Sequence, residues 1–281
     1  MSELLEFVVQ GILLGSAYGL VALPISIVYA TTHSVDAAVG GHAVVAATTA
    51  AAIGGAAGVV LGVVAGLLST CLVGIVYLLL RRRGDVHPIT TVLATFGIAF
   101  ALQGLVLMLH GRDPVVGHAF SRNWNIVGLS LYPQSVMNLF FGILVMVAVA
   151  FVLSRTPLGR ALRACADSAQ GAQLAGLSLS GLQFAAILMG GALASLAGIL
   201  LLYTTGVTYT AGLNITLTAI AAAVLFGFKG PIHGFAGGLL FGVVQALVTG
   251  YTSGGLAAAV PFFFIFVVLS LGKAVPVVSR P

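Results

Sequence analysis

Residues 58–80 read GVVLGVVAGLLSTCLVGIVYLLL, a run without a charged side chain. A helix of about 20 apolar residues is long enough to cross the roughly 30 Å hydrocarbon core of a bilayer. Three arginines, Arg81 to Arg83, follow at once, and basic residues are typical of loops on the cytoplasmic side of a membrane. The run therefore predicts a membrane-spanning helix whose C-terminal end faces the cytoplasm.

The whole chain shares this character. Of its 281 residues, 60% are hydrophobic and 6% are charged, and the mean hydropathy is +1.17. A soluble domain carries roughly a quarter charged residues, so this composition excludes a water-soluble globule. The formal net charge of +5 sits in short loops between apolar runs, which indicates membrane topology rather than nucleic-acid binding.

Further apolar runs cover about 7–30, 37–57, 88–110, 135–154, 182–204, 214–228, 232–251 and 256–272. The expected fold is an all-α polytopic membrane protein, a single transmembrane domain over residues 1–281 with about eight transmembrane helices, eight or nine in all. Two runs, 37–57 and 214–228, are short or interrupted by Gly, Thr or Asn. They predict broken or re-entrant segments. The acidic first six residues lack the basic region of a secretory signal, so the first run is expected to stay in the mature protein.

Glycines recur at four-residue spacing in three of these runs, a pattern that favours close helix packing in lipid. They are Gly11, Gly15 and Gly19, then Gly54, Gly58, Gly62 and Gly66, and later Gly234, Gly238 and Gly242. Packing within the chain is the simpler interpretation of each stripe, ahead of a subunit interface.

The remaining basic residues orient the chain. They are Arg155, Arg160 and Arg163, followed by Lys229, Lys273 and Arg280. If Arg81 to Arg83 are cytoplasmic, each later group returns to the same side after two crossings. The C-terminus is then cytoplasmic, and the loop 111–134 with Trp124 is external. Trp124 is a candidate contact for a soluble partner, although tryptophan is equally typical of the membrane interface.

The loop 155–181 predicts a cytoplasmic helix over residues 157–176. Thr156 can cap its start, Pro157 suits the first helical position, and Gly176 can end it in a left-handed conformation. Its expected apolar side consists of Ala161, Leu162, Cys165, Ala169, Ala172 and Leu174. From the residues alone, this helix either docks into a partner protein or lies on the membrane surface.

This segment, with GRA at 159–161, RA at 163–164 and LAG at 174–176, resembles the cytoplasmic loop of LivH-type branched-chain amino-acid permeases of ABC importers. The similarity extends to GSAYGL at 15–20, to PITTVLATFG at 88–97 with Gln103 beyond it, and to GFKGPIHG at 227–234. It covers nearly the whole chain. In that family the loop carries the helix that couples to the ATPase. The resemblance therefore implies coupling residues Pro157, Gly159, Arg160, Ala161, Arg163, Ala164, Leu174, Ala175 and Gly176.

The resemblance also implies a function and partners. The chain is expected to be a pore-forming permease subunit in the bacterial cytoplasmic membrane, importing branched-chain or hydrophobic amino acids, or related small polar solutes such as amides and urea, by alternating access. Expected partners are a second homologous permease, two ATP-binding subunits, an external solute-binding protein and membrane lipid. ATP and Mg²⁺ would bind those ATP-binding subunits.

The chain itself is not expected to be an enzyme. Neither Lys229 nor Lys273 follows the Gly-x-x-x-x-Gly frame of a Walker A loop. Cys71 and Cys165 lack metal-like spacing, so no metal site is expected.

One departure from the family leaves the solute open. Where relatives carry Asn-Phe-Ala-His-Gly, positions 36–40 read Asp-Ala-Ala-Val-Gly, so only Ala38 and Gly40 agree. Asp36 has His33 and His42 nearby in sequence. It is either an intramembrane functional acid or part of a polar surface turn over residues 31–36, and the turn is the favoured interpretation.

Candidate pathway residues are polar or small groups in or near the apolar runs, because such groups can line a solute path. They are Asp36, Gly40, Thr95, Gln103, Thr208, Asn214 and Thr218. Each hydroxyl could instead bond a neighbouring helix. The alternative function, an ion- or proton-coupled secondary transporter or channel, would call for coupling acids and repeated halves; the sequence offers one such acid and no evident repeat.

Overall fold

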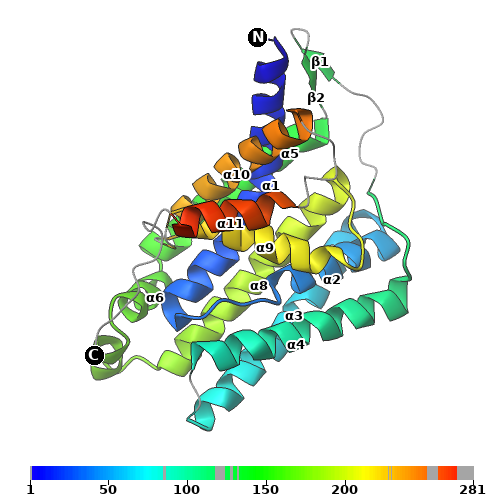
Figure 1. Ribbon diagram of the computed structural model, residues 1–281. Coiled ribbons are helices and arrows are strands. Elements are labelled where there is room, and N and C mark those ends of the chain that lie inside the picture. The colour runs from blue at the N-terminus through cyan, green and yellow to red at the C-terminus, as the bar shows by residue number, and fades with distance from the viewer. Residues whose placement is uncertain are drawn as a thin grey trace.

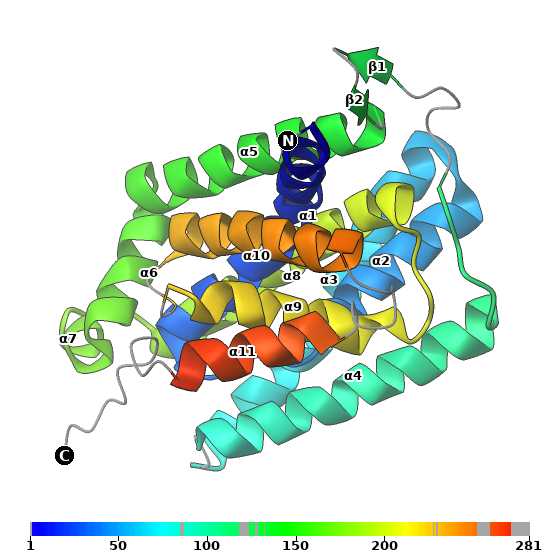
Figure 2. The same ribbon diagram turned by 45° about the horizontal axis from the view of Figure 1, so that its top comes forward.

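The computed structural model describes residues 2–84, 87–117, 124–126, 129–131, 133–226, 228, 230–251 and 259–270. The chain folds into a bundle of helices with one small hairpin (Figures 1 and 2). The elements are α1 Ser2–Thr32, α2 Val39–Ile53, α3 Gly55–Arg82, α4 Pro88–His110, β1 Trp124–Ile126, β2 Leu129–Leu131, α5 Pro133–Arg155, α6 Pro157–Asp167, α7 Ala169–Leu174, α8 Leu179–Thr204, α9 Ala211–Val224, α10 Pro231–Tyr251 and α11 Val260–Ser270. The all-α polytopic prediction is confirmed.

Among the described residues, six helices are long and apolar enough to span a membrane: α1, α3, α4, α5, α8 and α10. The sequence predicts about eight membrane helices, and two shorter apolar helices, α2 and α9, make up the difference. They have 15 and 14 residues. At 1.5 Å per residue neither reaches 30 Å. These two helices are the segments that the sequence predicts to be broken or re-entrant.

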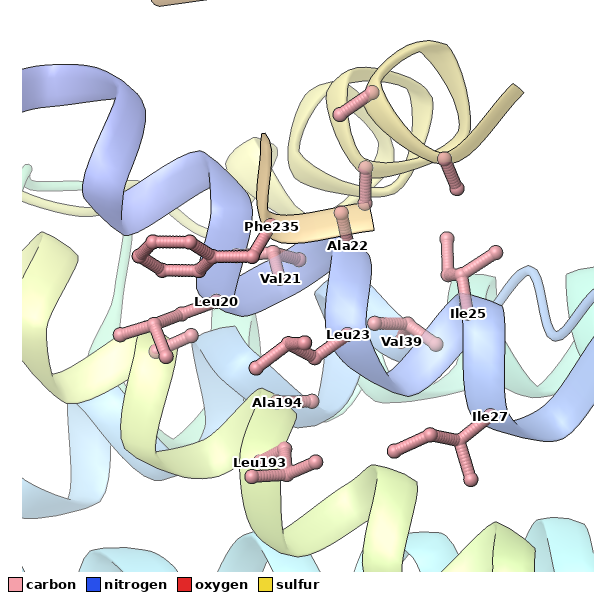
Figure 3. Close-up of a cluster of buried hydrophobic side chains, with 14 of the residues drawn as sticks. Leu20, Val21, Ala22, Leu23, Ile25, Ile27, Val39, Leu193, Ala194 and Phe235 are labelled. Carbon is pink, nitrogen blue, oxygen red and sulfur yellow. The ribbon is translucent and has the colours of Figure 1, made fainter. Parts of the chain in front are cut away.

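Helix α1 is the centre of the bundle, packed against α8, α9 and α10. Figure 3 shows Leu20 and Leu23 of α1 among side chains of α2, α8 and α10, and both leucines are almost fully buried. By contrast α4 and α5, on opposite flanks in Figure 2, expose large apolar side chains such as Met108 and Phe140. Their outer faces are suited to lipid.

The contact between α1 and α10 is made backbone to backbone. A Cβ added at Gly238 would overlap the backbone of Gly19, and one at Gly242 would overlap the backbone of Gly15. Small residues allow this approach, which gives dispersion contacts that larger side chains would prevent. The structure thus places two of the glycine stripes in packing within the chain.

Two backbone features break the regular helical hydrogen bonding, one between α2 and α3 and one within α1. Gly54 and Gly55 have φ of 73° and 62°, a region that favours glycine, and they turn the chain from α2 into α3. Pro24 lies inside α1 and leaves the carbonyl of Leu20 without its helical N–H donor.

The basic groups at 81–83 and 155–163 meet at one end of the bundle. The Arg81 guanidinium donates to Gln183 Oε1 of α8. Gln183 Nε2 in turn donates to Thr31 O at 3.0 Å, and Cys165 Sγ of α6 lies 4.0 Å from the same carbonyl. The N-terminus and the β1–β2 hairpin lie at the opposite end from α6 (Figure 1). Lys229, Lys273 and Arg280 fall outside the described residues.

Candidate functional site

The linker between α1 and α2, residues 33–38, is held in the interior by hydroxyl groups from two other helices. Thr95 Oγ1 of α4 accepts a hydrogen bond from Ala37 N at 3.0 Å. Thr216 Oγ1 of α9 accepts from Gly40 N at 2.9 Å and donates to Ala37 O at 3.1 Å. Both threonines are buried. A short, irregular backbone at membrane depth needs such partners because no water is available there.

Gly40 is required for this contact between α2 and α9. A Cβ at this position would overlap the carbonyl oxygen of Gly212 in α9. Thr95 and Thr216 therefore form a clamp on Ala37 and Gly40. Of the predicted pathway residues, Gly40 and Thr95 take part in it, and Asp36 lies in the linker that it holds.

Asp36 is buried, with 5% of its surface exposed, so the favoured interpretation of residues 31–36 as a surface turn is wrong at this residue. Its Oδ1 accepts from Ala38 N at 2.8 Å, in the manner of an Asx turn. The clamp on Ala37 and Gly40 draws the linker inward, which no local sequence pattern encodes.

The other oxygen of Asp36 faces a fully buried histidine. Asp36 Oδ2 lies 3.8 Å from His42 Nε2, and His42 Nδ1 lies 2.7 Å from Ser69 Oγ. The bond from Ser69 Oγ to Gly66 O at 2.8 Å favours the tautomer in which Nδ1 donates to Ser69. Nε2 has no hydrogen-bond partner among the described residues. Two buried acceptors facing each other are unfavourable, so a stable arrangement requires a proton on Nε2 or on Oδ2.

Replacing Thr216 with valine is expected to destabilise the clamp. The change keeps the shape but leaves Gly40 N and Ala37 O unpaired, at about 1–3 kcal/mol for each buried group. Thr48→Val is the matched control, because Thr48 is equally buried but bonds Val44 O of its own helix. The melting temperature in detergent should fall by several degrees for Thr216→Val and hardly change for Thr48→Val. Equal melting temperatures would contradict the role of the clamp.

The predicted cytoplasmic helix is two helices, α6 and α7. Thr156 Oγ1 accepts from Gly159 N at 3.1 Å and caps α6, as expected. Ser168 interrupts the run, because its backbone is extended and its Oγ accepts from Gly171 N at 3.0 Å to cap α7. The prediction of one continuous helix over 157–176 is wrong for this reason. Gly176 has φ of 79°, the left-handed conformation that the sequence suggests.

One side of this pair of helices packs on the bundle and the other is open. Leu162, Cys165 and Ala172 are buried. A Cβ at Gly159 would overlap the backbone at Val152 and Leu153, so this residue seats α6 rather than facing outward. Leu174, expected on the apolar packed side, is instead 91% exposed.

Most of the predicted coupling residues lie on the open side. Those exposed are Pro157, Arg160, Arg163, Ala164, Leu174, Ala175 and Gly176, while Ala161 is half-buried. Arg163 reaches Ser154 O at 3.3 Å, whereas no hydrogen bond or ion pair to the described part of the chain holds the Arg160 side chain. We call these seven residues the coupling face.

The other predicted pathway residues lie elsewhere. Asn214 and Thr218, one turn apart on α9, line a cavity together with Tyr18 and Gln245. Gln103 of α4 lines an apolar crevice near the start of α9. Thr208 lies in the segment before α9, with its hydroxyl 3.2 Å from that of Thr210. The seven candidates thus divide among the clamp with the linker that it holds, the cavity, and two separate positions.

The profile of the family described as "branched-chain amino acid transport system, permease component" matches residues 7–270. The chain belongs to this permease family. The full-length relatives include the high-affinity branched-chain amino acid permease LivH of Salmonella typhimurium and that of Escherichia coli K12. Each is 26% identical, over 99% of this chain and 96% of the relative.

Other relatives carry different names. The nucleoside ABC transporter permease protein NupB of Lactococcus lactis is 29% identical over 76% of this chain and 66% of its own length. Among solved structures, PsaBC from Streptococcus pneumoniae aligns with a TM-score of 0.54 at 12% identity, over 94% of this permease and 91% of that chain. At this identity the structural match concerns the fold alone.

Sequence reasoning missed several residues that organise this permease. Thr216 closes the clamp from 176 positions away from Gly40, and Gln183 joins Thr31 from 152 positions away. Neither belongs to a local motif. Gln183 is a polar residue near the start of a long apolar helix, and that position was the one signal that could have drawn attention to it.

Proposed function

We propose that this permease is a pore-forming subunit of an ATP-binding-cassette importer, with ATP hydrolysis on separate subunits. The observation that supports this most is the coupling face. It lies at the end of the bundle that carries the basic clusters, and it combines exposed arginines with Leu174, a large apolar side chain left almost fully uncovered. A leucine outside the membrane-spanning helices with 91% of its surface exposed suits a partner's groove.

The proposed solutes are branched-chain or hydrophobic amino acids or related small polar solutes. Relatives are named for branched-chain amino acids, for nucleosides and for autoinducer 2. Family membership therefore supports a small solute and does not select one. An external binding protein would deliver the solute and a second homologous permease would complete the pore.

In the proposed mechanism, the ATP-binding subunits grip the coupling face and displace α6. The displacement reaches the ends of three spanning helices, because Thr31 of α1, Arg81 of α3 and Gln183 of α8 meet Cys165 at one point. Access to the pore then alternates between the two sides of the membrane.

The test is uptake of radiolabelled leucine and adenosine into vesicles that hold this chain with its neighbouring gene products. We expect uptake of one of them to require ATP and to stop with vanadate, and a proton gradient alone to drive none. Gradient-driven uptake without ATP would contradict the proposal.

One observation favours a second candidate, a proton-coupled carrier. Asp36 and His42 lie 3.8 Å apart in the buried interior, and intramembrane acids serve as proton relays in pumps and transporters. In that case Asp36→Asn, which can keep the bond from Ala38 N, would abolish gradient-driven uptake.

A further inference from the structure

Several polar side chains line the cavity beside the start of α9, together with apolar ones. It has a volume of about 220 Å³ and is lined by Tyr18, Leu201, Thr205, Gly206, Ala211, Asn214, Ile215, Thr218, Gln245 and Pro261. Asn214 is exposed and Gln245 is partly exposed. Exposing a side-chain amide of a membrane helix to the hydrocarbon of the bilayer costs free energy. Such side chains therefore face protein or a water-filled space. This position on the bundle is therefore unsuited to lipid contact.

The polar groups converge from three helices and are incompletely satisfied. Tyr18 of α1, Thr218 of α9 and Gln245 of α10 line the same space. Gln245 Oε1 has no hydrogen-bond partner among the described residues. A buried carbonyl oxygen without a donor is a place for an N–H or O–H group from outside the chain.

An aromatic row adjoins the cavity, because Tyr18 belongs both to the row and to the cavity lining. Phe241, one helical turn before Gln245 on α10, is fully buried. Its ring lies 5.6 Å from that of Tyr18 and 5.3 Å from that of Phe264 on α11, both edge to face. Edge-to-face aromatic pairs are favourable, so the row holds α1, α10 and α11 together beside the cavity.

We propose that this cavity is a chamber for the transported solute, in the half of the membrane away from the coupling face, and that the solute carries no net charge. The inference rests on the proposed transport function. Among the described residues, no carboxylate, histidine, lysine or arginine lines the chamber; its polar groups are two amides, two threonine hydroxyls and one phenol. These can bond a neutral or zwitterionic solute through its N–H and C=O groups, whereas a net charge would have no counter-ion.

The size agrees with a small solute. A volume of about 220 Å³ lies below the roughly 300–1,000 Å³ typical of pockets for drug-sized ligands. The apolar part of the wall, from Leu201, Ile215 and Pro261, suits an aliphatic or flat non-polar group. A single small molecule with a polar end and an apolar end fits this lining.

The chamber is tested by cysteine labelling, which does not depend on ATP-driven uptake. In a background with Cys71→Ala and Cys165→Ala, Asn214→Cys is exposed to a charged, membrane-impermeant methanethiosulfonate in vesicles made permeable by freezing and thawing. The control is Phe140→Cys on α5, a membrane-helix position that is 65% exposed and has an apolar surrounding. We expect Asn214→Cys to react at least ten times faster, because the chamber is wet and the α5 face meets lipid. Equal rates would overturn the proposal.

The solute class is tested by protection. Leucine, adenosine or urea at millimolar concentration should slow labelling of Asn214→Cys, and arginine or glutamate should not. Stronger protection by a charged solute, or protection by none, would overturn the assignment. Fast, solute-protected labelling without ATP-driven uptake would instead count against the transport mechanism and leave the chamber standing.

Discussion

Gly238→Val is expected to lower the amount of folded permease in the membrane at least ten-fold. Any side chain at Gly238 overlaps the backbone nitrogen and Cα of Gly19, and neither backbone can move without pulling α1 out of the core. Helix association in lipid depends on this close packing rather than on a hydrophobic driving force. The separation of α1 and α10 would therefore remove the largest contact in the bundle.

Gly104→Val is the matched control. Gly104 also lies inside a spanning helix, α4, but a Cβ there meets nothing within 4 Å. Membrane levels of fluorescent fusions, followed by size-exclusion chromatography, should fall for Gly238→Val and stay near the unsubstituted level for Gly104→Val. Similar losses for both would show that valine itself, rather than the α1–α10 contact, is responsible.

Arg160→Glu is expected to reduce ATP-driven uptake at least ten-fold while the permease remains folded. No group in the described part of the chain neutralises the Arg160 side chain. Replacing Arg160 therefore leaves no buried or charged group of the fold unpaired. A glutamate at position 160 would reverse the charge that the coupling face presents to the partner subunit, and like-charge contacts in an interface are costly. The loss should appear as weaker co-purification of the ATP-binding subunits.

Arg83→Glu controls for charge reversal at the same end of the bundle, because Arg83 is also exposed but lies outside the coupling face. It should leave uptake and co-purification within about two-fold of normal. Unchanged co-purification and uptake in Arg160→Glu would show that the coupling face does not bind the ATP-binding subunits as proposed.

Helix positions follow closely from the sequence, because apolar runs and capping residues are local signals. The split of the segment 157–176 at Ser168 was missed, since both serine and the flanking alanine and aspartate residues also occur within helices. Leu174 was misplaced for a related reason. A continuous helical periodicity through Ser168 puts it on the packed side, and the break rotates it outward.

The candidate site could be predicted in part. Polar residues at interrupted helices do gather at two places, but which of them meet depends on tertiary hydrogen bonds across long stretches of chain. Thr216 and Thr218 lie on the same short helix, and only the structure separates the residue that holds the linker from the residue that lines the chamber. Asp36 was expected in solvent because its neighbours are polar, while the clamp that buries it comes from α4 and α9.

Pro24 gives α1 a mechanical property that its length alone would not suggest. Thr31, where the coupling end is tied, and Tyr18, which lines the chamber, are 13 residues apart on α1, or about 20 Å along a helix axis. The missing hydrogen bond at Pro24 lies between them and makes bending easier there. We expect α1 to bend at Pro24, so that a displacement of its C-terminal end near Thr31 reorients the segment that carries Tyr18. The stiffness of the helix at Pro24 would then determine how much of that displacement reaches the solute chamber.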